Sequence, residues 1–169
     1  MKYLKKIIYA LIILFLLSCS SNEDGTITNN GFKVNGKFYA TDFASASCCS
    51  PYILIFSSDS DSNIGQFGRF DLLPEVGLNN NTPLSPGTYT FKNFGIYKGH
   101  AVQFHDTTLP DSTILAYTSS GSNGIKSGTV TVNSVSNDGH QIIEINLDYK
   151  FVWEDRTVIG HYSGPVTPS

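Results

Sequence analysis

Several residue types are scarce in this sequence. It contains one methionine, one tryptophan and three cysteines among 169 residues, and alanine is also infrequent. Serine, threonine, glycine, asparagine and aromatic residues are abundant instead, which is typical of strands and turns. The composition argues against a mainly helical protein, and the length fits one domain around one core.

Basic residues are also few, with eleven lysines and arginines against fourteen acidic residues. Lys2, Lys5 and Lys6 all lie in the first six residues, so a chain that loses this segment keeps eight basic and fourteen acidic residues, a net charge of −6. Nucleic acids and anionic headgroups attract basic surfaces. We therefore expect neither as a partner.

The chain lacks an apolar run long enough for a membrane-spanning helix. Its longest run, residues 7–17, has about eleven residues, whereas a spanning helix needs about 20. A short apolar run after basic residues and before a small residue, here Ser18, is the pattern of a secretory signal peptide. We therefore predict that residues 1–18 are a signal peptide that is removed.

The end of this segment, Leu16-Leu17-Ser18-Cys19, resembles the lipobox of bacterial lipoproteins. The resemblance implies that the Cys19 thiol receives a diacylglycerol and that cleavage makes Cys19 the mature N-terminus. The membrane would then be a partner through this lipid, because two or more acyl chains give stable attachment. Residues 19–30 are polar and lack periodicity, so we expect a flexible tether before an all-β domain over residues 31–169.

An acidic pair, Glu23-Asp24, follows the cysteine. With Ser20, it resembles the export signal of Bacteroidota surface lipoproteins. The resemblance implies an outer-membrane location with the domain exposed at the cell surface; attachment that faces the periplasm is the alternative.

The clearest strand pattern covers residues 143–153, where apolar and polar residues alternate. Such alternation predicts a long strand with one buried face. The residues expected on the buried face are Ile143, Ile145, Leu147, Tyr149, Phe151 and Trp153. Those expected on the other face include Glu144, Asn146, Asp148 and Lys150.

Similar segments at residues 128–133 and 157–163 predict neighbouring strands, joined to the first by turns at residues 137–139 and 154–156. These three strands should form an antiparallel meander. Further strands are predicted at residues 32–34, 37–40, 52–56, 66–72, 88–91, 97–104 and 113–117. About ten short strands without a helix are typical of a single antiparallel β-sandwich or β-barrel, and the sequence does not choose between the two.

The opening segment at residues 32–40 and the closing segments at residues 127–132 and 157–164 resemble small, uncharacterised Bacteroidota lipoproteins. The resemblance covers about a third of the chain and rests mainly on turns and alternating strands. It implies a β-rich lipoprotein domain and no particular activity.

Cys48 and Cys49 are adjacent, and adjacent residues of an extended chain point in opposite directions. They are therefore poorly placed to bind one metal ion together. Free or structural thiols are one interpretation. A vicinal or intermolecular disulfide is another, since an exported chain meets oxidising conditions. A metal or redox function is the third.

No established catalytic or metal motif is present. Asp59, Asp61 and Asn63 have the spacing of calcium ligands, but Ile64 and Phe70 occupy positions that need glycine and glutamate. The four histidines do not cluster, and neither an HExxH nor a Gly-x-Ser-x-Gly motif occurs. We assign no catalytic residue, no metal ligand and no cofactor.

Three functions fit the sequence. The first is a membrane-anchored, non-catalytic domain that binds a glycan or a protein, for which exposed aromatic rings would be a signature. The second is a hydrolase of glycans or peptides, built from carboxylates such as Asp71, Glu75, Glu144, Asp148 and Glu154. The third is a barrel that carries a small apolar ligand.

Overall fold

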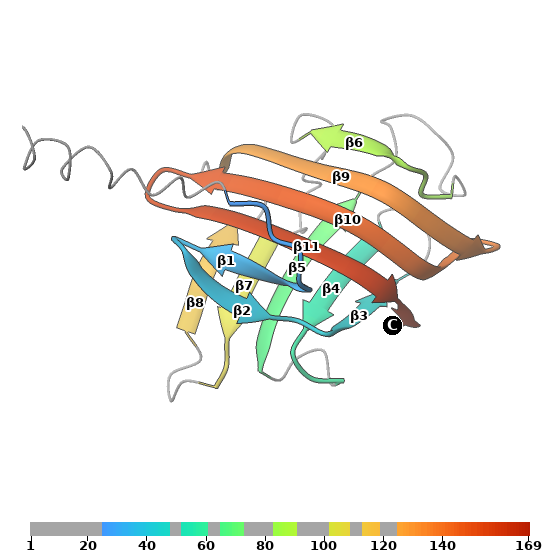
Figure 1. Cartoon of the computed structure of the whole chain (residues 1–169), viewed down its shortest axis with the longest axis horizontal. Helices are drawn as coiled ribbons and strands as arrows, with labels where there is room; N and C mark the ends of the chain where they lie inside the picture. Colours follow the sequence, from blue (N-terminus) through green and yellow to red (C-terminus); the bar gives the residue numbers. More distant parts are fainter. Residues whose placement is uncertain are drawn as a thin grey trace, which may run out of the picture.

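The structure is a computed structural model that describes residues 25–47, 52–60, 65–72, 83–90, 102–108, 113–118 and 125–169. These residues form two six-stranded sheets that pack face to face (Figure 1). Within these ranges no helix has the length and apolar character that a membrane crossing requires.

Sheet A has the strand order β2 (Lys37–Ala40), β1 (Gly31–Val34), β11 (Thr157–Pro165), β10 (Gln141–Trp153), β9 (Ile125–Asp138) and β6 (Gly87–Thr90). Sheet B has the order β12 (Thr167–Pro168), β3 (Phe43–Ala46), β4 (Tyr52–Ser57), β5 (Gln66–Leu72), β7 (Val102–Asp106) and β8 (Thr113–Thr118). All neighbours are antiparallel except β12 and β3, which run parallel.

This arrangement confirms the predicted all-β sandwich. The barrel alternative is wrong, because the two sheets stay separate and do not close into one. The carrier hypothesis required that barrel. In Figure 1 the long strands β9, β10 and β11 of sheet A cross over the strands of sheet B.

Two tight turns have the geometry that their sequences predict. Asn35 and Gly36 join β1 to β2 with φ angles of 48° and 84°, the double positive φ of a type I′ turn. Gly139, in the turn between β9 and β10, has a φ of 61°. Glycine and asparagine tolerate this left-handed region, so the turn residues also determine the strand register.

Aromatic side chains fill the space between the sheets. Tyr149 and Tyr162 of sheet A and Phe56 and Phe70 of sheet B are all buried. Rings of the two sheets contact each other directly, with centroid distances of 5.0 Å for Phe70–Tyr149, 5.1 Å for Phe56–Tyr162 and 5.0 Å for Phe32–Phe104. Such pairs add about 0.5–1.5 kcal/mol each beyond the burial of their area.

The central strand β10 follows the predicted alternation with one exception. Ile145, Leu147, Tyr149 and Phe151 are buried as expected. Ile143 was predicted to be buried, but it is 47% exposed. The register with β9 shifts between Ile142 and Glu144, so Ile143 lies in a bulge and Ile142 takes the buried place.

Twelve strands are described, against about ten predicted. The prediction missed β3, which is short and rich in alanine and serine, and β12, which has two residues and contains a proline. Neither segment has the β-branched alternation that reveals a strand. Of the predicted strand at residues 97–104, residues 97–101 lie outside the described ranges.

The turn between β10 and β11 also connects the two sheets. The Arg156 guanidinium donates a hydrogen bond to the Leu115 carbonyl of β8 at 2.5 Å and pairs with Asp155. The hydrogen bond from Arg156 holds the pKa of the Asp155 carboxyl below its usual range. One arginine therefore fixes the turn and ties sheet A to sheet B.

Candidate functional site

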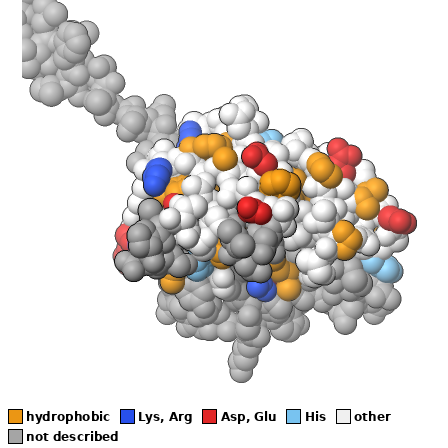
Figure 2. Space-filling model, turned by 90° about the horizontal axis from the view of Figure 1, so that it is seen from below, with side chains coloured by type: hydrophobic (Ala, Val, Ile, Leu, Met, Phe, Trp, Pro, Cys, Tyr) orange, Lys and Arg blue, Asp and Glu red, His pale blue; other side chains and the backbone are white. Residues whose placement is uncertain are grey.

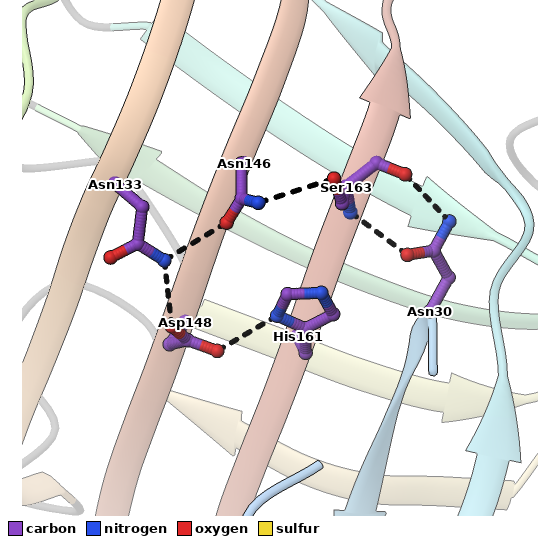
Figure 3. A network of polar contacts seen from close by, with 6 residues as sticks. All are labelled: Asn30, Asn133, Asn146, Asp148, His161 and Ser163. Carbon is purple, nitrogen blue, oxygen red and sulfur yellow. Dashed lines mark hydrogen bonds and ion pairs between the residues drawn. The ribbon is translucent and has the colours of Figure 1, made fainter. Parts of the chain in front are cut away.

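The outer face of sheet A carries a group of polar side chains (Figure 3). The alternate residues of β10 and β11 face the core, so the residues between them point outward. Asn146 and Asp148 of β10, His161 and Ser163 of β11 and Asn133 of β9 belong to this outward set. The register pairs Asp148 with His161 and Asn146 with Ser163, which places the two pairs next to each other.

Hydrogen bonds join these side chains across three strands. One carboxylate oxygen of Asp148 lies 2.8 Å from His161 Nδ1, and the other accepts a hydrogen bond from Asn133 Nδ2 at 2.8 Å. The same Asn133 nitrogen donates to Asn146 Oδ1 at 2.9 Å, and Asn146 Nδ2 donates to Ser163 Oγ at 3.2 Å. We call these five residues and Asn30 the polar network.

Asn30 connects the segment before β1 to this network. Its side-chain amide accepts a hydrogen bond from the Ser163 N–H at 2.8 Å and donates one to the Ser163 carbonyl at 3.1 Å. The backbone carbonyl of Asn30 accepts a further hydrogen bond from the Thr41 N–H at 3.3 Å. The Asn30 side chain thereby replaces the backbone of a neighbouring strand beside β11.

A hollow of about 280 Å³ lies next to the network. The segment Gly25–Ile27 forms one wall, and strands β10 and β11 form the rest. Its lining residues are Gly25, Thr26, Ile27, Asp148, Tyr149, Lys150, Ile159 and Gly160. Ile27 is buried here although it precedes the first strand. Asp148 belongs to both the hollow and the polar network.

The two central groups of the network differ in exposure. The His161 side chain is 15% exposed, whereas the Asp148 side chain is 50% exposed. Asp148 is thus held by neighbours on both oxygens and still faces solvent. Each carboxylate oxygen has two lone pairs, so the group keeps the capacity to accept hydrogen bonds from a ligand.

A histidine beside a carboxylate is also part of many hydrolase sites, in which the histidine activates a nucleophile. Within the described ranges no hydroxyl or thiol makes a hydrogen bond with His161. Ser163 lies on the same strand, but its hydroxyl accepts a hydrogen bond from Asn146. The pair therefore orients the Asp148 carboxylate, and none of the described hydroxyl groups is hydrogen-bonded to the histidine as a nucleophile would be.

Among the described residues there is no group of three or more metal-binding side chains. Of the calcium-like segment, Asp61 and Asn63 lie outside the described residues. Asp59 is described, and its carbonyl accepts a hydrogen bond from Ser57 Oγ at 2.5 Å. Asp59 therefore helps to hold the end of β4.

The three cysteines that the sequence singled out, Cys19, Cys48 and Cys49, lie outside the described residues, as does His100. His105 is on the outer face of sheet B, where its ring stacks on Phe67 at a centroid distance of 4.7 Å. Burial lowers the pKa of His105. The structure therefore does not bring His105 and His161 together.

The candidate carboxylates of a hydrolase do not converge in the part of the chain that is described. Asp71 is on sheet B, Glu144 and Asp148 are four residues apart on β10 of sheet A, and Glu154 is in a turn where it pairs with Lys126. Glu75 lies outside the described residues.

The aromatic residues are mainly core residues. Among the described residues, the exposed large aromatic side chains are Phe38 and Phe43, at 39% and 47%. Figure 2 shows hydrophobic side chains scattered among polar ones on the face that it draws. The residues that the structure describes therefore do not form the exposed aromatic patch expected of a binding domain.

The sequence identified two members of the polar network, Asn146 and Asp148, as residues of a solvent-facing strand surface, and it named Asp148 among the candidate hydrolase carboxylates. It missed the contributions of Asn30, Asn133 and Ser163. The alternation pattern was a signal for the face, but the contacts depend on cross-strand register. That register includes shifts between β9 and β10 that alternation does not reveal.

Comparison of the chain with known protein families, with curated proteins and with solved structures found no match.

Proposed function

We propose that this chain is a lipid-anchored extracytoplasmic protein whose domain binds a glycan, without catalysis, on the outer face of sheet A. The observation that carries the proposal is the polar network. Its amide, carboxylate and imidazole groups come from three strands and an adjoining segment, and hydrogen bonds hold them in fixed orientations. Binding groups that are oriented in advance lose little entropy when a ligand arrives.

The chemistry of this face favours a glycan over a protein. The buried centre of a protein interface is rich in aromatic residues and poor in charged ones. The outer positions of β9, β10 and β11 instead carry Thr131, Asn146, Asp148, Lys150 and His161. A polyhydroxylated ligand offers both donors and acceptors to such side chains. The protein partner is the competing outcome.

The absence of a nucleophile beside His161 in the described ranges supports the non-catalytic part of the proposal. Ligand binding explains the geometry of the Asp148–His161 pair better than catalysis does. The less exposed His161 side chain holds one oxygen of the carboxylate in place, and the more exposed Asp148 carboxylate offers its remaining lone pairs to the ligand.

The anchor is proposed to be a lipid on Cys19, with the outer membrane as the location. Cys19 and Gly25 are six residue steps apart, which span at most about 20 Å when fully extended. The Asn30–Ser163 contacts hold the chain where it enters the domain. Sheet A would then lie close to the bilayer, at the cell surface or facing the periplasm.

The anchor is tested by metabolic labelling with an alkyne-bearing fatty acid and by membrane fractionation. Cys19→Ala should abolish the label and release the protein from membranes, whereas Cys48→Ala should change neither. Label that persists in Cys19→Ala would contradict the anchor.

Glycan binding is tested on an array of bacterial and host glycans with the full chain, purified in a detergent that contains no sugar. The wild type should bind a defined subset of glycans. Asp148→Asn should lose that binding, and Glu154→Gln, which removes a carboxylate from an exposed turn, should retain it. If the array shows no binding and the chain instead binds a protein that carries no glycan, the partner is a protein and the glycan proposal is wrong.

A further inference from the structure

The hollow between the segment Gly25–Ile27 and sheet A has a chemistry of its own. Ile27 and Ile159 are apolar residues of its lining, and Thr26, Asp148 and Lys150 are polar or charged ones. A sugar ring has the same division, because its C–H groups form apolar patches and its hydroxyl groups surround the ring. The isoleucine side chains of the hollow can thus contact the C–H patches of such a ring, and its polar side chains can bind the hydroxyl groups.

The Asp148 carboxylate is the group that would select this ligand. Its position is fixed from two sides, by His161 at 2.8 Å and by Asn133 at 2.8 Å. Two adjacent hydroxyl groups of a sugar can donate to the two oxygens of one carboxylate, and hydrogen bonds to a charged acceptor are strong. A fixed, half-exposed carboxylate is therefore well suited to accept hydrogen bonds from two neighbouring hydroxyl groups of a sugar.

The charges around the hollow do not favour anionic ligands. Asp148 would repel a uronic acid or a sulfated sugar, whereas Lys150, which also lines the hollow, would attract it. The two opposite charges leave an anion little net attraction, and a charged ligand would also lose its hydration, so a neutral sugar is favoured. The size gives a further limit. At about 280 Å³ the hollow lies just below the range of about 300–1,000 Å³ found for drug-sized ligands. Its volume corresponds to about one sugar ring, and further rings would lie outside it.

We propose that this hollow is the subsite for a single neutral sugar ring, a hexose or an N-acetylhexosamine. The proposal rests on the proposed glycan-binding function and specifies which part of the glycan is held where. The ring packs against Ile27 and Ile159 and donates hydroxyl hydrogen bonds to Asp148. The rest of the glycan extends over the polar network.

The position of the segment Gly25–Ile27 gives this subsite an unusual wall. The wall belongs to the stretch that leads toward the proposed anchor, and it is held on one side by the buried Ile27 and by Asn30. Thr26, which precedes every strand of the domain, would therefore contact the ligand, and its NMR signal would show the binding.

The experiment is an NMR titration of the full chain in a detergent without sugar. The probes are glucose, galactose, N-acetylglucosamine and galacturonate, each added to millimolar concentration. At least one neutral sugar should shift the amide signals of Thr26, Ile27 and Ile159, and galacturonate should not. Asp148→Asn should weaken the binding about tenfold or more, because it removes a charged hydrogen-bond acceptor.

Two further variants separate local from general effects. Ile159→Trp should fill the hollow and abolish the shifts, while Glu154→Gln should leave the affinity within about twofold. If no neutral sugar shifts these signals although the array shows glycan binding, the subsite is refuted and the proposed function stands. If neither experiment shows binding, both proposals are refuted.

Discussion

The two faces of strands β10 and β11 are built from alternate residues of the same segments, yet they differ completely in chemistry. Inward, Leu147, Tyr149 and Tyr162 are buried among aromatic rings. Outward, Asp148 and His161 join a hydrogen-bonded polar network. Under the proposed function, stability depends on the inner side of the sheet and glycan binding on the outer side, so substitutions on one side should leave the property of the other side unchanged.

The inner face depends on close packing. The rings of Tyr149 and Phe151 both contact Phe70 from the opposite sheet. Gly160, opposite Tyr149 on β11, leaves space for the tyrosine ring. The Tyr149 hydroxyl has no hydrogen-bond partner among the described residues, and burial raises the pKa of that hydroxyl. Packing rather than polarity therefore holds Tyr149 in place.

The largest effect is expected for Phe151→Ala. This change removes a fully buried ring that contacts Phe70 and Trp153. Loss of a buried aromatic ring costs about 3–5 kcal/mol. Urea denaturation of the full chain should show this loss of unfolding free energy. A loss below about 1 kcal/mol would contradict the role of the inner face.

The next effect concerns Gly160→Ala. A Cβ at this position would clash with the Tyr149 ring, 2.1 Å from Cζ. Overpacking of a core costs about 1–3 kcal/mol, measured by the same denaturation. In a Tyr149→Ala background the ring is gone, so Gly160→Ala should cost much less. Equal costs in both backgrounds would show that the two positions are independent.

The outer face should behave in the opposite way. Asp148→Asn should change the unfolding free energy by less than about 1 kcal/mol, because the pair with His161 is partly exposed. It should nevertheless lower glycan affinity about tenfold or more. Glu154→Gln, the matched control, should change neither quantity. A large loss of stability in Asp148→Asn would show that the network is structural.

The smallest effect is expected at His105 on the outer face of sheet B. Burial lowers its pKa below 6.5, so the unfolded chain takes up the proton more readily than the folded chain. The related stability is therefore complete above about pH 6.5 and is lost as the pH falls toward the lower pKa of the folded state.

His105→Phe keeps the stacking on Phe67 and removes the titration. The melting temperature of this variant should fall less between about pH 7 and 5 than that of the wild type. His140→Gln changes an exposed turn residue and should keep the wild-type slope. Identical slopes for wild type and His105→Phe would assign the pH dependence to other groups.

The comparison of the two faces also explains which features the sequence could reveal. Alternation in β10 and the Asn35-Gly36 turn are local properties, and both predicted the structure correctly. Ile143 was placed on the wrong face because a bulge depends on pairing with β9. The short strand β3 was missed because its pairing partners, and not its own residues, make it a strand.

The candidate site depended still more on distant contacts. Asn30 and Ser163 are 133 positions apart in the chain, and their hydrogen bonds follow from the pairing of β1 with β11. The hollow requires in addition that Gly25–Ile27 lies against β10 and β11. A single sequence carries no signal for these contacts, although it does identify Asp148 as outward-facing.

The most direct test of the account is an NMR experiment on the full chain with the glycan selected on the array. The side-chain amide signals of Asn30, Asn133 and Asn146 should shift when the glycan binds. That of Asn137, which lies outside the network at the C-terminal end of β9 and donates a hydrogen bond to the Leu84 carbonyl, should not. Shifts confined to sheet B, or a chain that binds no glycan, would contradict the claim that the outer face of sheet A is the binding surface.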